Sequence, residues 1–163
     1  MAFDTAALIA RANRLRVFQS DELAKKTHEN EQAIVRSHAA RGLLHSGNLI
    51  SSLATLHKKN LPSAVEKAWE LLKETHQAMG RDTSPETRQA MTSWMMDAIH
   101  LVARRASAQI AQGIAQYGGG LQNRLMLAVD ETEQMENSLR SRYEAVIDNH
   151  LDQIMNNPTP EQT

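Results

Sequence analysis

A stripe of apolar side chains near the C-terminus constrains the fold of this chain more than any other feature. Apolar or near-apolar residues return every three or four positions, at 121, 125, 128, 132, 135, 139, 143, 146, 150 and 154. This spacing places them along one face of a helix. A helix over residues 121–155 would be about 50 Å long at roughly 1.5 Å per residue. A compact domain of 163 residues is narrower than that. The stripe therefore predicts an elongated molecule in which long helices pack side by side.

A run of three glycines separates this stripe from an earlier one. Gly118, Gly119 and Gly120 follow a helical pattern over residues 85–117 and precede the final stripe. One continuous rod is disfavoured, because a glycine inside a helix costs up to about 1 kcal/mol relative to alanine. The three glycines are therefore predicted to form a hinge, and residues 85–155 a long C-terminal helical hairpin.

Start and stop signals divide the rest of the chain into helices. Asp4 is the predicted N-cap of a first helix that ends near Phe18, because its carboxylate can accept hydrogen bonds from free backbone N–H groups. Residues 20–59 form either one bent helix or two. Pro62 is predicted to begin the next helix, which stops at Gly80.

The predicted fold class is all-α, an elongated helical bundle of four to six helices. It forms a single domain over residues 1–155, followed by a disordered tail at 156–163 that contains two prolines. Aromatic residues make up only 4% of the chain, so aliphatic side chains and methionine have to form the core. Such side chains suit packing between helices, and no strand-like alternation competes with this interpretation.

The composition also excludes several classes of protein. The chain has no cysteine, which removes disulfides, thiolate metal sites and cysteine nucleophiles. Its first residues show no basic region followed by a long apolar stretch, and no run of about 18 apolar residues occurs anywhere. We therefore expect a soluble, cytoplasmic protein without membrane insertion.

The net charge of −1 conceals a gradient along the chain. Residues 1–59 carry nine Lys and Arg against five Asp and Glu, whereas residues 121–163 carry three against eight. Two interpretations are open. The acidic last helix packs near the basic first helices within one molecule, or one end of a subunit attracts the opposite end of another. Charges of this size affect pairing and association more than fold.

The seven histidines raise the question of a metal site. Asp97 and His100 stand three positions apart on one helix, where two side chains can converge on one ion. A di-iron carboxylate bundle uses a Glu-x-x-His pair twice, whereas this chain has a single Asp-x-x-His. Asp97 and His100 are thus the metal-ligand candidates, and a polar pair without metal is the simpler interpretation. No motif indicates a catalytic residue or a cofactor.

The leading hypothesis is a non-enzymatic interaction or assembly protein. It would form a homo-oligomer, or bind a protein partner, through long amphipathic helices of coiled-coil type. The predicted interaction surface is the stripe of the last helix, formed by Leu125, Met135, Leu139, Tyr143, Ile147, His150, Leu151 and Ile154. One alternative is a helical-bundle metal protein or enzyme that uses Asp97 and His100. A second is a weak nucleic-acid-binding regulator, against which the interspersed acids and scarce aromatics argue.

Overall fold

The computed structural model is all-helical and describes residues 3–43, 47–117 and 122–157, with side chains at 122–126, 128 and 129 outside the description. Within these described ranges it contains four helices: α1 (Thr5–Ala40), α2 (Gly47–Ala78), α3 (Pro85–Tyr117) and α4 (Gln122–Asn156). Each helix has 32 to 36 residues, so each is roughly 50 Å long. None of the described helices is long and apolar enough to cross a membrane.

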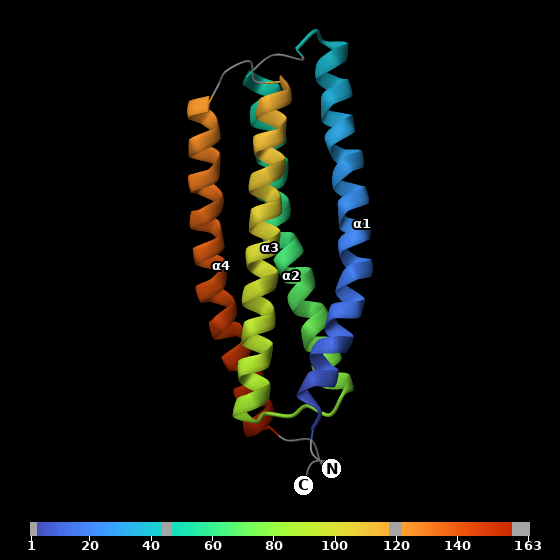
Figure 1. Cartoon of the computed structure of the whole chain (residues 1–163), viewed down its shortest axis with the longest axis vertical. Coiled ribbons are helices and arrows are strands. Elements are labelled where there is room, and N and C mark those ends of the chain that lie inside the picture. The colour runs from blue at the N-terminus through green and yellow to red at the C-terminus, as the bar shows by residue number, and fades with distance from the viewer. Residues whose placement is uncertain (1–2, 44–46, 118–121, 158–163) are drawn as a thin grey trace.

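The four helices lie side by side in an elongated bundle (Figure 1). α3 packs against each of the other three helices, and α2 also packs against both α1 and α4. α1 and α4 make no contact with each other in the described residues, and lie on opposite sides of the α2–α3 pair (Figure 1). The bundle is therefore open between its first and last helices.

α3 and α4 run antiparallel, and polar pairs join them at two levels. Arg88 donates to Asp148 over 2.6 Å and to Asp152 over 2.8 Å. Further along, His100 Nδ1 lies 2.7 Å from a carboxylate oxygen of Glu136. The predicted glycine hinge lies outside the described residues, as does the predicted tail beyond residue 157, so both stay predictions.

Both ends of α1 follow local backbone chemistry. The carboxylate of Asp4 accepts a hydrogen bond from the Ala7 backbone N–H over 2.9 Å, which confirms the predicted N-cap. At the other end, Gly42 has φ +71° and Leu43 N–H donates to the carbonyl of His38 over 2.8 Å. This is a Schellman end, which requires a residue that tolerates positive φ.

The predicted end of the first helix near Phe18 is wrong, since α1 continues without a break to Ala40. Ser20 and Asp21 are residue types that often form an N-cap, yet each costs only about half a kcal/mol inside a helix. A break would leave several backbone groups on each side without partners. Continuing the helix is therefore the less costly solution.

The predicted helix start at Pro62 is also wrong, because Pro62 lies inside α2. Proline lacks the N–H that would donate to the carbonyl four residues earlier, and its ring crowds that carbonyl. Leu61 and Val65 on either side are fully buried. Burial of these side chains offsets the local penalty, which holds the two segments in one helix.

The turn between α2 and α3 fits its sequence signals. Gly80 has φ +119° directly after α2, which confirms the predicted stop. Ser84 then caps α3, because its hydroxyl accepts from the Thr87 N–H over 3.3 Å and Pro85 occupies the first helical position. This turn fixes the antiparallel pairing of the two central helices.

The hydrophobic core is concentrated at one end of the bundle, near the start of α1 and the end of α4. All four helices contribute to it, through Leu8, Ala12, Leu61, Val65, Ala68, Trp69, Leu72, Met91, Trp94, Met95, Ala98, Ile99, Ala103, Ala106, Leu139, Tyr143, Ile147 and Leu151. A second cluster toward the other end consists of Ile50, Ile110 and Ile114. One half of the bundle therefore contains a much larger hydrophobic cluster than the other half.

Candidate functional site

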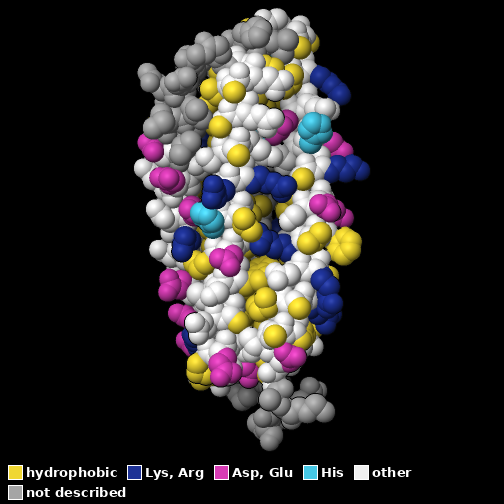
Figure 2. Space-filling model, in the orientation of Figure 1, with side chains coloured by type: hydrophobic (Ala, Val, Ile, Leu, Met, Phe, Trp, Pro, Cys, Tyr) yellow, Lys and Arg dark blue, Asp and Glu magenta, His cyan; other side chains and the backbone are white. Residues whose placement is uncertain are grey.

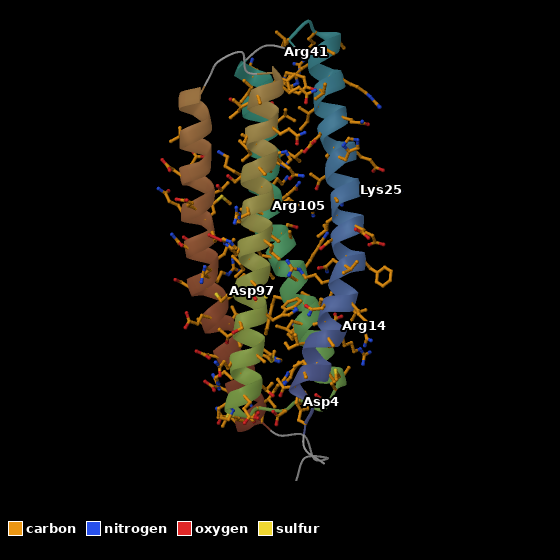
Figure 3. The ribbon with its side chains drawn as sticks, in the orientation of Figure 1. Asp4, Arg14, Lys25, Arg41, Asp97 and Arg105 are labelled. Carbon is orange, nitrogen blue, oxygen red and sulfur yellow. The ribbon has the colours of Figure 1, made fainter. Side chains whose placement is uncertain are left out.

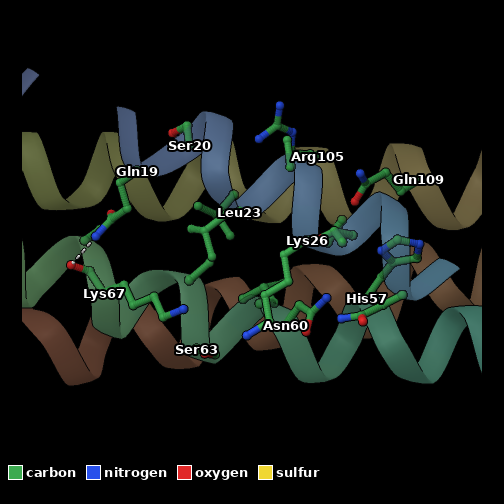
Figure 4. Close-up of a pocket in the computed structure, with 18 of the residues that line it drawn as sticks. Gln19, Ser20, Leu23, Lys26, His57, Asn60, Ser63, Lys67, Arg105 and Gln109 are labelled. Carbon is green, nitrogen blue, oxygen red and sulfur yellow. Dashed lines mark hydrogen bonds between the residues drawn. The ribbon is translucent and has the colours of Figure 1, made fainter. Parts of the chain in front are cut away.

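α1 separates from the core after its first turns. Its buried residues are Leu8 and Ala12 near the start and His38 near the end. Between Ala12 and His38, α1 lies over α2 and α3 but buries none of its own described residues. A cavity of about 140 Å³ lies beneath this part of α1. This cavity, which we call the α1 cavity, is the candidate site (Figure 4).

The α1 cavity is lined by three helices and combines an apolar floor with polar walls. Its floor includes Leu61, Ala68 and Ala106, all buried. Amide and hydroxyl side chains line the walls, namely Gln19, Ser20, Thr27, Asn30, Asn60, Ser63 and Gln109. A cavity of this kind can accept a small molecule with an apolar body and a polar group.

Four cations surround the α1 cavity: Arg16, Lys26, Lys67 and Arg105. No Asp or Glu is among its lining residues, and none of the four cations forms an ion pair within the described part of the chain. Figure 2 shows this face, where Lys and Arg side chains surround a hollow with exposed hydrophobic side chains. The potential inside the cavity is therefore positive.

Arg16 is held in place at one end of the α1 cavity. Its Nη2 donates to the carbonyl of Ala98 over 3.4 Å, and its guanidinium lies 5.5 Å from the centre of a Trp94 ring. Burial lowers the pKa of Arg16, while the nearby carboxylate of Asp97 acts in the opposite direction. Trp94 is itself fixed, because its indole N–H donates to Asn13 over 2.8 Å.

His57 closes the other end of the α1 cavity. It is buried, and its Nε2 lies 2.8 Å from a carboxylate oxygen of Glu31 on α1. Burial lowers the pKa of His57, against the opposing effect of Glu31. Because this ring is already engaged, the cavity has no free general base among its described lining residues. The arrangement supports binding rather than proton transfer.

A second cluster of histidines lies in the large core. The Nε2–H of His76 donates to the carbonyl of Asp82 over 2.7 Å, so its Nδ1 accepts from the Nε2–H of His150 over 3.2 Å. His150 stands edge-on to Trp69, with ring centres 5.4 Å apart. Burial favours the neutral form of both rings, which join α2, α4 and the α2–α3 turn through these hydrogen bonds.

The pKa values of both histidines reflect their burial. Burial, together with the nearby His76, Lys73 and Arg81, lowers the pKa of His150 to about 4. Burial also lowers the pKa of His76, although its hydrogen bond to Asp82 and the charge of that residue oppose the effect. A proton added to this pair would be poorly solvated.

The structure separates the two predicted metal-ligand candidates. His100 pairs with Glu136 of α4, whereas the Asp97 carboxylate interacts with Arg16 of α1. Figure 3 labels Asp97 and Arg105 on α3. Within the described residues, no group of three or more His, Asp and Glu side chains is placed to hold a metal ion. Asp97 and His100 thus contact different neighbours instead of one shared site.

The predicted interaction surface of α4 lies mostly inside the bundle. Leu139, Tyr143, Ile147, His150, Leu151 and Ile154 are buried, and Met135 is half-buried against the core. The Leu125 side chain lies outside the description. The stripe faces α3 and the core, which leaves these described side chains no free area for a partner unless the bundle opens.

Sequence reasoning missed the α1 cavity. Arg16, Gln19, Leu23 and Thr27 recur at helical spacing on one face of α1, but the break predicted near Phe18 divided this face between two helices. Comparison with protein-family models, curated proteins and solved structures finds no match for this chain.

Proposed function

We propose that this chain is a non-enzymatic assembly protein that associates with further copies of itself through oppositely charged faces. One observation carries the proposal: among the described residues, no backbone contact joins α1 to α4, and the two helices lie on opposite sides of the α2–α3 pair. The net-positive α1 and the net-negative α4 are therefore separated by the width of the bundle. Within the molecule, Lys58 of α2 pairs with Glu131, but α1 itself stays apart from α4.

Exposed apolar side chains on the α1 side support this proposal. Val17 is 60% exposed and Phe18 is 71% exposed on α1, and Leu101 of α3 is 57% exposed. Val17 and Leu101 line one shallow hollow together with Arg16 and Arg105, beside Asp21. Large apolar side chains close to cations are typical of surfaces that bind another protein.

A face of one copy that meets a different face of the next copy gives a head-to-tail contact. Such contacts close into rings or extend into filaments, depending on the rotation between copies. Opposite charge increases the association rate and selects the pairing, while apolar contact supplies most of the affinity. We therefore expect association that weakens as salt screens the charges.

Light scattering after size exclusion tests the proposal. At tens of micromolar protein and low salt, the mass should exceed that of the 18.2 kDa monomer, and it should fall as NaCl is raised. Phe18→Asp should shift the mass toward the monomer without changing the helical circular dichroism. Thr55→Asp, which adds the same charge at an exposed position of α2, serves as control. A monomer at every salt concentration contradicts the proposal.

A further inference from the structure

We propose that the α1 cavity binds a small organic anion, one with a compact apolar body and a single carboxylate or phosphate group. This site borders the hollow of Val17 and Leu101 proposed for assembly and shares Arg16 and Arg105 with it, but its occupant is a small molecule and not a second copy of the chain. Three properties of the cavity point to such a ligand: its cations, its apolar floor and its size.

The cations give the charge of the ligand. Arg16 and Lys26 come from α1, Lys67 from α2 and Arg105 from α3, so three helices bring positive charge to one cavity. Figure 4 shows Lys26 and Lys67 between α1 and α2, with Arg105 beside α3. The nearby acids are Glu31, which is engaged by His57, Asp97, which lies near Arg16, and Asp21 in the neighbouring hollow. An oxyanion would supply the charge that the cavity lining lacks.

The floor and the walls give the shape of the ligand. Leu61, Ala68 and Ala106 form buried apolar surface that an inorganic ion would leave uncovered. The volume of about 140 Å³ is close to the roughly 150 Å³ of an engineered cavity that holds benzene. The body of the ligand is therefore one small ring or a short chain. The oxyanion of the ligand stays near the cations that surround the α1 cavity.

The site is built into the fold. Gln19 donates to the carbonyl of Lys67 over 3.2 Å, which joins α1 to α2 at the cavity wall. Arg16 is fixed by Ala98 and Trp94, and His57 by Glu31. Because these neighbours are already ordered, binding costs little additional side-chain entropy.

Calorimetric titration with two matched pairs of probes tests the proposal. Phenyl phosphate and benzoate carry an oxyanion on a benzene ring, whereas benzyl alcohol and benzamide carry the ring with a neutral polar group. We expect one or both anions to bind with a stoichiometry of one per chain, and at least about tenfold more tightly than the neutral probes. The preferred anion distinguishes a phosphate ligand from a carboxylate ligand.

Two neighbouring arginines provide a variant and its control. Arg105→Gln should weaken binding of the preferred anion about tenfold, because Arg105 lines the cavity. Arg104→Gln removes the same charge one residue earlier, at a position that lines a different hollow beside α4, and should leave binding unchanged. Both arginines are exposed, so neither change should affect folding, which circular dichroism checks.

Three results would overturn the proposal. The first is that neither anion binds at millimolar concentration. The second is that the neutral probes bind as tightly as the anions. The third is that Arg104→Gln weakens binding as much as Arg105→Gln does. An acidic helical peptide that binds where the small anions fail would identify the cavity as part of a protein-docking surface instead.

Discussion

His76 and His150 link individual residues to the stability of the whole core. Both rings are buried, and in its neutral form His76 donates to the carbonyl of Asp82 and accepts from His150. The native pKa of each histidine is lowered from 6.5. The unfolded chain therefore binds more protons than the native chain at mildly acidic pH.

We predict that the free energy of unfolding decreases as the pH falls from about 6.5 toward the native pKa of His150 of about 4. Each such histidine contributes a slope of at most about 1.4 kcal/mol per pH unit, and its contribution is fully retained above pH 6.5. Urea denaturation at several pH values measures the effect. His150→Gln keeps an N–H donor for His76, but glutamine does not titrate. The free energy of unfolding of this variant should therefore change less steeply with pH.

His28→Gln provides the control for this experiment, since His28 is exposed on α1 and remote from the pair. The free energy of unfolding of His28→Gln should depend on pH in the same way as that of the unsubstituted protein. If His28→Gln flattens the slope and His150→Gln does not, the core pair is not the source of the acid sensitivity.

At the scale of the helix, local signals were readable from the sequence and long-range ones were not. The N-cap at Asp4, the stop at Gly80 and the start at Pro85 depend on neighbouring residues alone, and the structure confirms them. The continuity of α2 through Pro62 depends on burial of Leu61 and Val65 against other helices. Spacing within one segment contains no information about such contacts.

The candidate site was hidden for the same reason. Its cations come from positions 16, 26, 67 and 105 on three helices. The sequence does not show that the adjacent arginines at 104 and 105 face different neighbours, one toward α4 and the other toward the α1 cavity. The stripe on α4 was correctly identified as apolar, yet its partner is the core rather than a second protein chain.

Two aliphatic residues of α4 make this distinction measurable. Ile147 is fully buried, whereas Leu127 is 60% exposed. We predict that Ile147→Ala lowers the free energy of unfolding by about 2–4 kcal/mol, because it removes buried surface and leaves a cavity. Leu127→Ala should change it by less than about 0.5 kcal/mol. Chemical denaturation compares the two variants, and equal losses would contradict the packing described for α4.

At the scale of the whole molecule, most of the buried hydrophobic residues lie at one end of the bundle. The large cluster joins the start of α1 to the ends of α2 and α4 and to the first half of α3, while the far half holds the small isoleucine cluster. The second half of α1 lies above the α1 cavity and a further groove of about 550 Å³. Few buried apolar contacts therefore hold it to the bundle.

We predict that backbone amides of residues 19–37 exchange with solvent faster than those of residues 91–106. Exchange within a helix requires local opening, and opening is easier where less apolar surface is buried. Hydrogen–deuterium exchange with mass spectrometry resolves the two segments. Equal protection in both would show that the bundle opens as a single unit.

The lack of contact between α1 and α4 has a consequence for how this protein can change over time. A substitution on α3 affects three helix interfaces, because α3 packs against every other helix. Outside the large core cluster that both helices join, substitutions on α1 and on α4 affect no common interface, so their effects on stability should add. In those regions the two outer helices can accumulate changes independently, and the binding properties of one can be altered without first adjusting the other.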